Sequence, residues 1–222
     1  MSTAVNTRIP LWFKLSYRAF CVVLVPTYLM AYGPTNFLYF CDVALLTTLA
    51  AIWLESPLLA SAPAVGLLLP QALWVCDLLG AAVGMPLTGM TAYMFDSKLP
   101  LFTRSMSFFH FWLPFVLAWL VWRLGYDRRA FAVWTVTAWA LLSVCYFLMP
   151  APPAADGNLP VNINYVFGMS DAAPQSFMPG SMWFAMLLIG LPAIIFYPTH
   201  RLLLRYGANG PARSVGALSF DC

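Results

Sequence analysis

The chain has 222 residues, of which 62% are hydrophobic and only 9% are charged. Soluble domains carry roughly a quarter charged residues, so this composition excludes an ordinary water-soluble protein. The net charge of +3 is small and the basic residues are spread between hydrophobic runs, which excludes a nucleic-acid-binding surface. Because lipid-facing helices need no separate core, we expect one domain over residues 1–206, followed by a disordered polar tail over residues 207–222.

Six apolar stretches have the length of membrane helices. A bilayer core about 30 Å thick is crossed by about 20 helical residues. The stretches lie approximately at residues 15–32, 36–54, 57–81, 106–123, 130–149 and 181–200. The sequence therefore predicts an all-α, polytopic membrane protein built as a six-transmembrane-helix bundle.

Lys and Arg residues indicate how this bundle is oriented, because the cytoplasmic flanks of membrane helices retain them. Only Lys98 and Arg104 fall beside the other ends of the predicted helices. The rest share one side, namely Arg8, Lys14, Arg18, Arg123, Arg128, Arg129, Arg201, Arg205 and Arg213. An even number of spans with a cytoplasmic N-terminus and a cytoplasmic C-terminus explains this distribution.

Two of the predicted outer connections are long, at about residues 84–105 and 150–180. Their Pro, Gly, Asn and Asp content argues against further spans. Their methionines and aromatic residues favour a cap at the membrane interface, and loops of this length often carry function.

Four residues with reactive or ionisable side chains lie inside predicted spans. Charged groups in a membrane span cost at least several kcal/mol, so each needs a partner or a task. We expect Cys41 and Asp42 about five or six residues into the second helix, Asp77 near the outer end of the third, and His110 about one turn into the fourth. All four then lie roughly 6 to 9 Å below the outer boundary, at one shallow depth.

The residue types at this depth allow several roles. Cys41 can act as a nucleophile with His110 as general base, although a buried packing thiol and a carbonyl-bound histidine are the commoner arrangement. Asp42 and Asp77 can orient His110, form a proton or ion path, or bond to a neighbouring helix. No HxxxH, ExxH or CxxC spacing supports a metal site, and no cofactor motif occurs, so we expect neither a metal nor a cofactor.

Several short motifs occur in a distinctive order. They are Phe40-Cys41-Asp42-Val43-Ala44-Leu45-Leu46 in the second predicted helix, Gln71-Ala72-Leu73 followed by Asp77-Leu78 in the third, Phe108-Phe109-His110 at the start of the fourth, and Asn164-Tyr165 in the loop before the last. This order resembles the YwaF-like family of bacterial integral membrane proteins. It is more distantly similar to a eukaryotic transmembrane phospholipid acyltransferase and to the androgen-induced hydrolases of fatty-acid esters.

The resemblance implies a role for each matching position. Cys41 looks like the nucleophile and His110 like its base, while Asp77 matches a polar position of the third helix. Asn164 and Tyr165 would close the site from above, and Gln71 joins them as a substrate-binding candidate. The resemblance also implies a multi-pass protein of the bacterial inner membrane.

Two functions of different classes follow as expectations. The first is an intramembrane lipid acyl hydrolase or acyltransferase that uses Cys41 and His110, with Asp77 or Asp42 orienting His110. The alternative is a non-catalytic accessory subunit, or a small proton-coupled carrier that uses the two aspartates. The expected partners are membrane lipids, with a protein partner or a homo-oligomer as a further candidate, and no nucleic acid.

Overall fold

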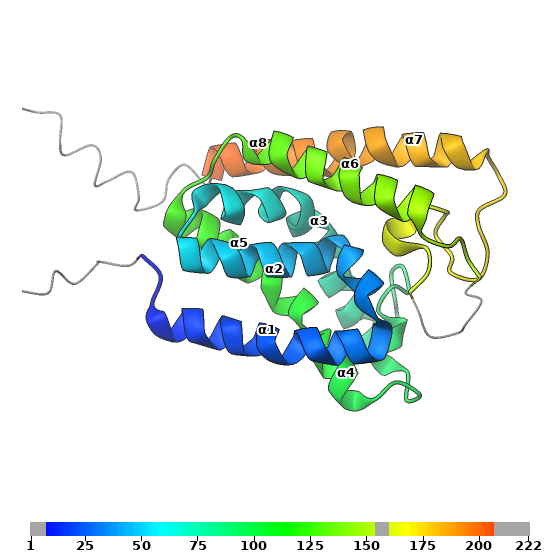
Figure 1. Ribbon diagram of the computed structural model, residues 1–222, viewed down its shortest axis with the longest axis horizontal. Coiled ribbons are helices and arrows are strands. Elements are labelled where there is room, and N and C mark those ends of the chain that lie inside the picture. The colour runs from blue at the N-terminus through cyan, green and yellow to red at the C-terminus, as the bar shows by residue number, and fades with distance from the viewer. Residues whose placement is uncertain (1–7, 154–159, 207–222) are drawn as a thin grey trace, which may run out of the picture.

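The computed structural model describes residues 8–153 and 160–206, and every regular element in these two ranges is helical (Figure 1). The main helices are α1 (Leu11–Tyr32), α2 (Phe40–Leu54), α3 (Pro57–Ala82), α5 (Phe109–Leu124), α6 (Ala130–Leu148) and α7 (Gly180–Gly190), which continues through the π-helical η4 (Leu191–Phe196) into α8 (Tyr197–Tyr206). The short elements are η1 (Pro34–Leu38), η2 (Ala92–Phe95), α4 (Leu101–Met106) and η3 (Ile163–Tyr165). The expected tail at residues 207–222 lies outside the described residues.

Five helical stretches are long and apolar enough to cross a membrane. They are Leu11–Tyr32, Pro57–Ala82, Leu101–Leu124, Ala130–Leu148 and Gly180–Tyr206. These stretches confirm the expected all-helical class and the membrane-helix character of the chain. The sixth expected span differs, because α2 has 15 residues. A helix of that size is about 22 Å long, which is shorter than a bilayer core of about 30 Å.

The shortness of α2 comes from the segment that precedes it. Gly33 ends α1 with a φ of 74° and Pro34 opens η1, so the chain turns before it can continue as a helix. Tyr39 is extended, with a ψ of 139°, and α2 begins only at Phe40. The helix expected from residue 36 therefore starts four residues later.

Helix α3 lies at the centre of the bundle and contacts α2, α5, α6 and α8. Residues 60–67 of α3 are all buried, and most of them are small. Small side chains let helices approach closely in the absence of a hydrophobic driving force between them. Gly66 is the closest of these approaches, since a Cβ there would lie 1.7 Å from Nε1 of Trp134 in α6.

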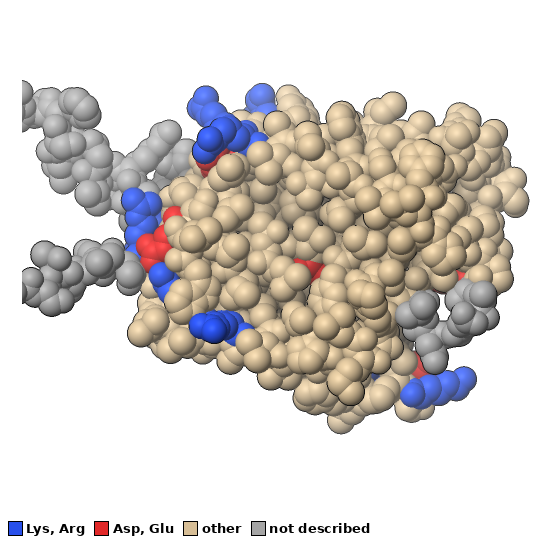
Figure 2. All heavy atoms as spheres, in the orientation of Figure 1, with Lys and Arg blue, Asp and Glu red and all other residues tan. Residues whose placement is uncertain are grey.

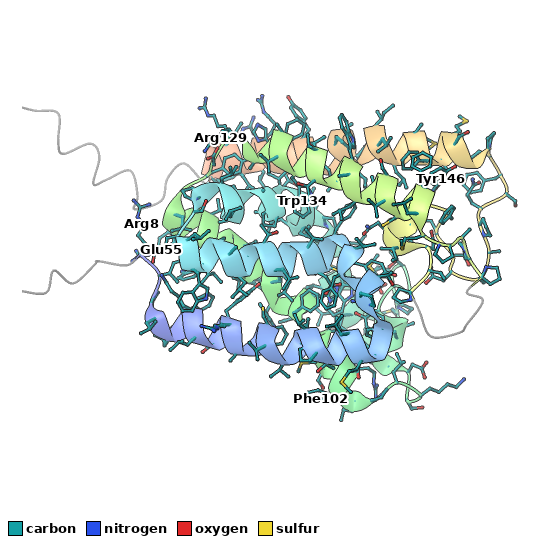
Figure 3. The ribbon with its side chains drawn as sticks, in the orientation of Figure 1. Arg8, Glu55, Phe102, Arg129, Trp134 and Tyr146 are labelled. Atoms are coloured by element: carbon teal, nitrogen blue, oxygen red, sulfur yellow. The ribbon has the colours of Figure 1, made fainter. Side chains whose placement is uncertain are left out.

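Most of the charged side chains gather at one end of the bundle, here called the basic end, where α1 begins and α8 ends (Figure 2). Arg8, Glu55 and Arg129 lie at this end (Figure 3). Glu55 accepts hydrogen bonds from the Arg8 backbone at 2.9 Å and from Lys14 Nζ at 2.7 Å. Glu55 therefore holds the segment before α1 against the turn between α2 and α3.

The opposite end, here called the loop end, carries the long connections at residues 83–100 and 160–179 (Figure 1). Arg104 holds the first connection by donating hydrogen bonds to the Met94 carbonyl at 2.9 Å and the Leu99 carbonyl at 3.1 Å. Asn162 holds the second, because its Nδ2 donates to the Gly168 carbonyl at 2.8 Å. Each connection is thus held in a folded conformation by hydrogen bonds from one side chain.

Candidate functional site

Cys41 and Asp42 lie in the first turn of α2, at the loop end. The Cys41 thiol donates to Asp42 Oδ2 at 3.8 Å, and Asn36 Nδ2 donates to the same oxygen at 3.2 Å. Asp42 is only 2% exposed, and its Oδ1 has no hydrogen-bond partner among the described residues. The expected position five or six residues into the helix was wrong because α2 begins at Phe40. An acid in the first turn is stabilised by the helix dipole.

Asn164 ties the start of α2 to the connection at residues 160–179. Its Oδ1 accepts a hydrogen bond from the Phe40 N–H at 3.0 Å, and its Nδ2 donates to the Leu38 carbonyl at 2.9 Å. The side chain therefore supplies a cap that no residue of α2 itself provides. Asn164 has a φ of 58°, a conformation that asparagine tolerates better than most residues.

Tyr165 follows Asn164 and is 42% exposed. Its carbonyl accepts a hydrogen bond from the Trp183 indole at 2.8 Å, which joins this connection to α7. The structure thus places Asn164 against Phe40, the residue before Cys41. Tyr165 contacts Trp183 through its backbone carbonyl.

His110 is the second residue of α5. Its Nδ1 lies 2.8 Å from the Ser107 carbonyl, and its ring stacks on Trp74 of α3 with centroids 5.1 Å apart. A carbonyl can only accept, so Nδ1 carries the proton and Nε2 of the neutral ring is left as an acceptor. Within the described chain, no hydrogen bond joins His110 to Cys41 or to either aspartate.

Asp77 has a role that differs from the expected one. Its Oδ1 accepts from the backbone of Thr88 at 2.6 Å and of Gly89 at 3.0 Å. Its Oδ2 accepts from the backbone and the hydroxyl of Thr91 at 2.9 and 2.7 Å. Both oxygens are thus engaged by the connection at residues 83–100, so this carboxylate anchors the connection instead of orienting His110. The Thr-Gly pair at residues 88–89 was the signal in the sequence, since successive N–H groups in a turn bind an anion.

Gln71 of α3 is 3% exposed, and its Oε1 has no hydrogen-bond partner among the described residues. Helices α2 and α3 are antiparallel and joined by the short turn at Glu55. At about 1.5 Å per residue, Asp42 and Gln71 both lie about 20 Å along their helices from that turn. The two side chains with unpartnered buried oxygens therefore occupy the same level of the bundle.

Three further side chains belong to this region, and the sequence did not single them out. The Tyr28 hydroxyl of α1 lies 2.7 Å from Ser107 Oγ, and Tyr93 comes from η2. Burial raises the pKa of the Tyr93 phenol above its ordinary value, and Cys41 adds to the rise, while Trp74 and Ser107 oppose it. These neighbours bring the connection at residues 83–100 close to the start of α2. Tyrosine and serine in an apolar helix are typical packing residues, so no sequence signal separated them.

The described residues contain no group of three or more His, Cys, Asp and Glu side chains that could hold a metal ion. The site has a thiol hydrogen-bonded to a buried carboxylate, an imidazole whose Nε2 has no hydrogen-bond partner among the described residues, and nearby phenols. Such a set can move protons and carry a nucleophile.

Comparisons with known protein families, with curated proteins and with solved structures find no match to this chain. The resemblance to the YwaF-like family and the activities that it implies therefore stay predictions.

Proposed function

We propose that the chain is a multi-pass protein of the bacterial inner membrane, with α2 as a sixth crossing segment and the basic end in the cytoplasm. The gathering of Lys and Arg at the end where α1 begins and α8 ends supports this orientation (Figure 2). The short α2 can cross if the membrane is thinned locally or if η1 completes the passage.

Cysteine labelling tests the orientation. A membrane-impermeant thiol reagent applied to intact cells should label Lys98→Cys but not Arg129→Cys, in a chain where Cys76 and Cys222 are replaced by serine. Lys98 and Arg129 are both exposed in the structure. Labelling of Arg129→Cys but not of Lys98→Cys would show that the protein has the opposite orientation.

For the activity, we propose acyl transfer from a membrane lipid ester, with water or a second alcohol as acceptor. The single observation that carries this proposal is the hydrogen bond from the Cys41 thiol to the buried carboxylate of Asp42. A thiol must lose its proton to become a nucleophile, and a carboxylate at its side can take that proton.

The reaction has two balanced steps. Cys41 Sγ attacks the ester carbonyl while Asp42 takes the thiol proton, and that proton passes to the departing alcohol as the C–O bond breaks. The product is an acyl thioester on Cys41. His110 Nε2 then takes a proton from the acceptor hydroxyl, whose oxygen attacks the thioester, and the proton returns to the Cys41 sulfur. The Tyr93 phenol is the available donor for the oxyanion of both steps.

A lipid-ester probe with a good leaving group tests this assignment on protein purified in detergent. Cys41→Ala should abolish the covalent acyl label, and Asp42→Asn should slow its formation. His110→Gln should leave the label intact but slow its release. Cys76→Ala is the matched control, because Cys76 is an exposed cysteine of α3 with no place in the site. Undiminished labelling of Cys41→Ala, or undiminished turnover of His110→Gln, would end the proposal.

A second candidate is a small proton-coupled carrier or an accessory subunit. It is favoured by Oδ1 of Asp42, which has no hydrogen-bond partner among the described residues. A buried carboxylate oxygen without a donor is suited to binding and releasing a proton. Asp77 is less suited, because donors from residues 88–91 occupy both of its oxygens. In proteoliposomes, this function predicts that Asp42→Asn abolishes proton uptake while Cys41→Ser preserves it. The acyl-transfer function predicts that Cys41→Ser abolishes activity.

A further inference from the structure

A compact group of cationic and aromatic side chains lies at the basic end, where the turn between α5 and α6 meets α8. The Tyr126 hydroxyl is hydrogen-bonded to Nδ1 of His200, and the ring of Phe131 lies 5.3 Å from the His200 ring. Arg128 follows Tyr126 by two residues and Arg201 follows His200 directly, so this hydrogen bond brings together the two segments that carry these arginines. None of these residues takes part in the site at the loop end.

The hydrogen bond to Tyr126 occupies Nδ1 of His200, which leaves Nε2 as the ring nitrogen for a ligand. The phenol hydroxyl can donate or accept, so this bond allows either neutral tautomer of the ring. An anionic oxygen at Nε2 selects the tautomer that carries its proton on Nε2, and the Tyr126 hydroxyl then donates to Nδ1. His200 can thus offer one N–H donor to an anionic ligand.

The two arginines nearby are exposed and form no ion pair in the described part of the chain. The acids at this end are already engaged, since Asp127 pairs with Arg129 at 2.8 Å and Glu55 with Lys14 at 2.7 Å. The guanidinium of Arg201 is placed over the Tyr197 ring, 6.0 Å from its centroid. Two planar guanidinium forks with an imidazole N–H are a donor set that matches the oxygens of a phosphate group.

The surface beside this group is apolar. Ile194 is 73% exposed, Tyr197 49% and Leu202 48%, all on the helical stretch that ends at α8. A ligand that places a phosphate on the arginines would lay any attached hydrocarbon along these side chains. This combination favours a phospholipid over a soluble phosphate compound.

We propose that Arg128, Arg201 and His200 bind the headgroup phosphate of an anionic phospholipid in the leaflet at the basic end. The site is separate from Cys41 and Asp42, and it does not depend on the acyl-transfer activity. It gives the bundle a fixed lipid at the end opposite the reactive thiol.

Native mass spectrometry of the purified full chain tests the site by titration with phosphatidylglycerol, with phosphatidylcholine and with inorganic phosphate alone. The Arg128→Gln/Arg201→Gln variant should bind phosphatidylglycerol about tenfold more weakly, the loss expected when charge-assisted hydrogen bonds to phosphate are removed. Tyr126→Phe should weaken binding less, because it releases the His200 ring without removing a charge. The control variant Arg18→Gln/Lys98→Gln has the same net charge as the arginine variant. It should bind phosphatidylglycerol as tightly as the unchanged protein does.

Three results would overturn the assignment. They are equal affinity of the arginine variant and its control, phosphatidylcholine bound as tightly as phosphatidylglycerol, and inorganic phosphate bound alone with the same loss in the variant. The third result would assign the site to a soluble phosphate ligand. Thermal midpoints of all variants report whether folding is retained, and Tyr126→Phe keeps the test informative if the double variant is unstable.

Discussion

Thr91 donates two hydrogen bonds to the same oxygen of Asp77, one from its backbone N–H at 2.9 Å and one from its hydroxyl at 2.7 Å. Both residues are fully buried. The pair fastens the connection at residues 83–100 to the end of α3, beside the start of α2. Asp77 was predicted to take part in catalysis, but its hydrogen bonds hold the connection in place.

Asp77→Asn should loosen this connection. An asparagine keeps one acceptor oxygen but sets an NH₂ group against donors of residues 88–91, so N–H groups lose their partners. The expected cost is about 2–4 kcal/mol of folding free energy, typical of charge-assisted bonds lost in a buried place. Limited trypsin digestion at the exposed Lys98 measures the effect as faster cleavage.

Asp96→Asn is the control for this prediction, because Asp96 is exposed and its side chain accepts one bond, from the Lys98 backbone. It should be cut at nearly the unchanged rate. Equal cleavage of Asp77→Asn and Asp96→Asn would show that the Asp77 carboxylate does not hold the connection.

The contact between Gly66 and Trp134 predicts a strict size limit. A Cβ on residue 66 would meet the Trp134 indole at 1.7 Å, so Gly66→Ala must displace the ring or the helices. Overpacking of this kind costs about 1–3 kcal/mol. The midpoint of thermal unfolding in detergent should fall, whereas Gly190→Ala should leave it unchanged, because nothing lies within 4 Å of a Cβ there.

The same contact predicts a rescue. The Trp134 Nε1 is buried and has no hydrogen-bond partner among the described residues, so Trp134→Phe removes an unsatisfied donor together with ring volume. In a Trp134→Phe background, Gly66→Ala should cost clearly less than it does alone. Additive losses in the double variant would place the strain elsewhere.

Trp139 compensates for a proline in the last helical stretch. Pro192 has no N–H to donate to the Leu188 carbonyl, and the Trp139 indole donates to that carbonyl instead, at 2.8 Å. Trp139→Phe leaves this carbonyl without a donor on a lipid-facing surface, so the unfolding midpoint should drop by the equivalent of about 1–2 kcal/mol.

A Pro192→Ala background separates the hydrogen bond from the packing of the indole. Alanine at position 192 restores an N–H that can reach the Leu188 carbonyl. Trp139→Phe should then cost little. If the loss is the same in both backgrounds, the indole stabilises the helices through its ring alone.

Stability should depend on acid pH through Glu55 at the basic end. Burial tends to raise the pKa of the Glu55 carboxyl, but the Lys14 ammonium and the backbone donors of Arg8 and Ile9 outweigh it and hold the pKa below the ordinary 4.5. A carboxyl with a lowered pKa in the folded state stabilises the fold above its unfolded pKa. That contribution is lost as the pH falls from 4.5 through the folded value.

Thermal midpoints measured in detergent from about pH 6 to about pH 3 check this dependence. The unchanged protein should lose stability in the lower part of that range. Glu55→Gln should start from a lower midpoint and show a smaller decline, because glutamine has no carboxylate that acid can protonate. Parallel curves for the two proteins would assign the acid sensitivity to other carboxyls.

Local sequence was sufficient for most of the long helices and for the basic end. Apolar runs of membrane length can satisfy their backbone only as helices, so the stretches now seen as α1, α3, α5, α6 and the α7–α8 stretch could be predicted from composition. The positions of Lys and Arg beside those runs predicted one charged end. The start of α2 was missed by four residues, because the break at Gly33 and Pro34 competes with the apolar pattern.

The candidate site could be predicted only in part. That Cys41 stands beside an acid is evident from the chain itself, and the presence of His110 at the start of a helix was expected. The hydrogen-bond partners in this region were not predicted, because no sequence pattern distinguishes Asn36, Ser107 and Tyr28 from packing residues.

By itself the sequence determined that this protein is a bundle of apolar helices with one charged end, because those properties depend on each segment and its flanks. Only the tertiary structure decided that Asn164 caps α2 across the fold, that Asp77 holds a connection, and that the Cys41 thiol bonds to Asp42 and not to His110. In each case a polar side chain forms hydrogen bonds with one of several polar groups in the chain. Hydrogen bonds discriminate over tenths of an ångström, and helix packing, not local pattern, sets those distances.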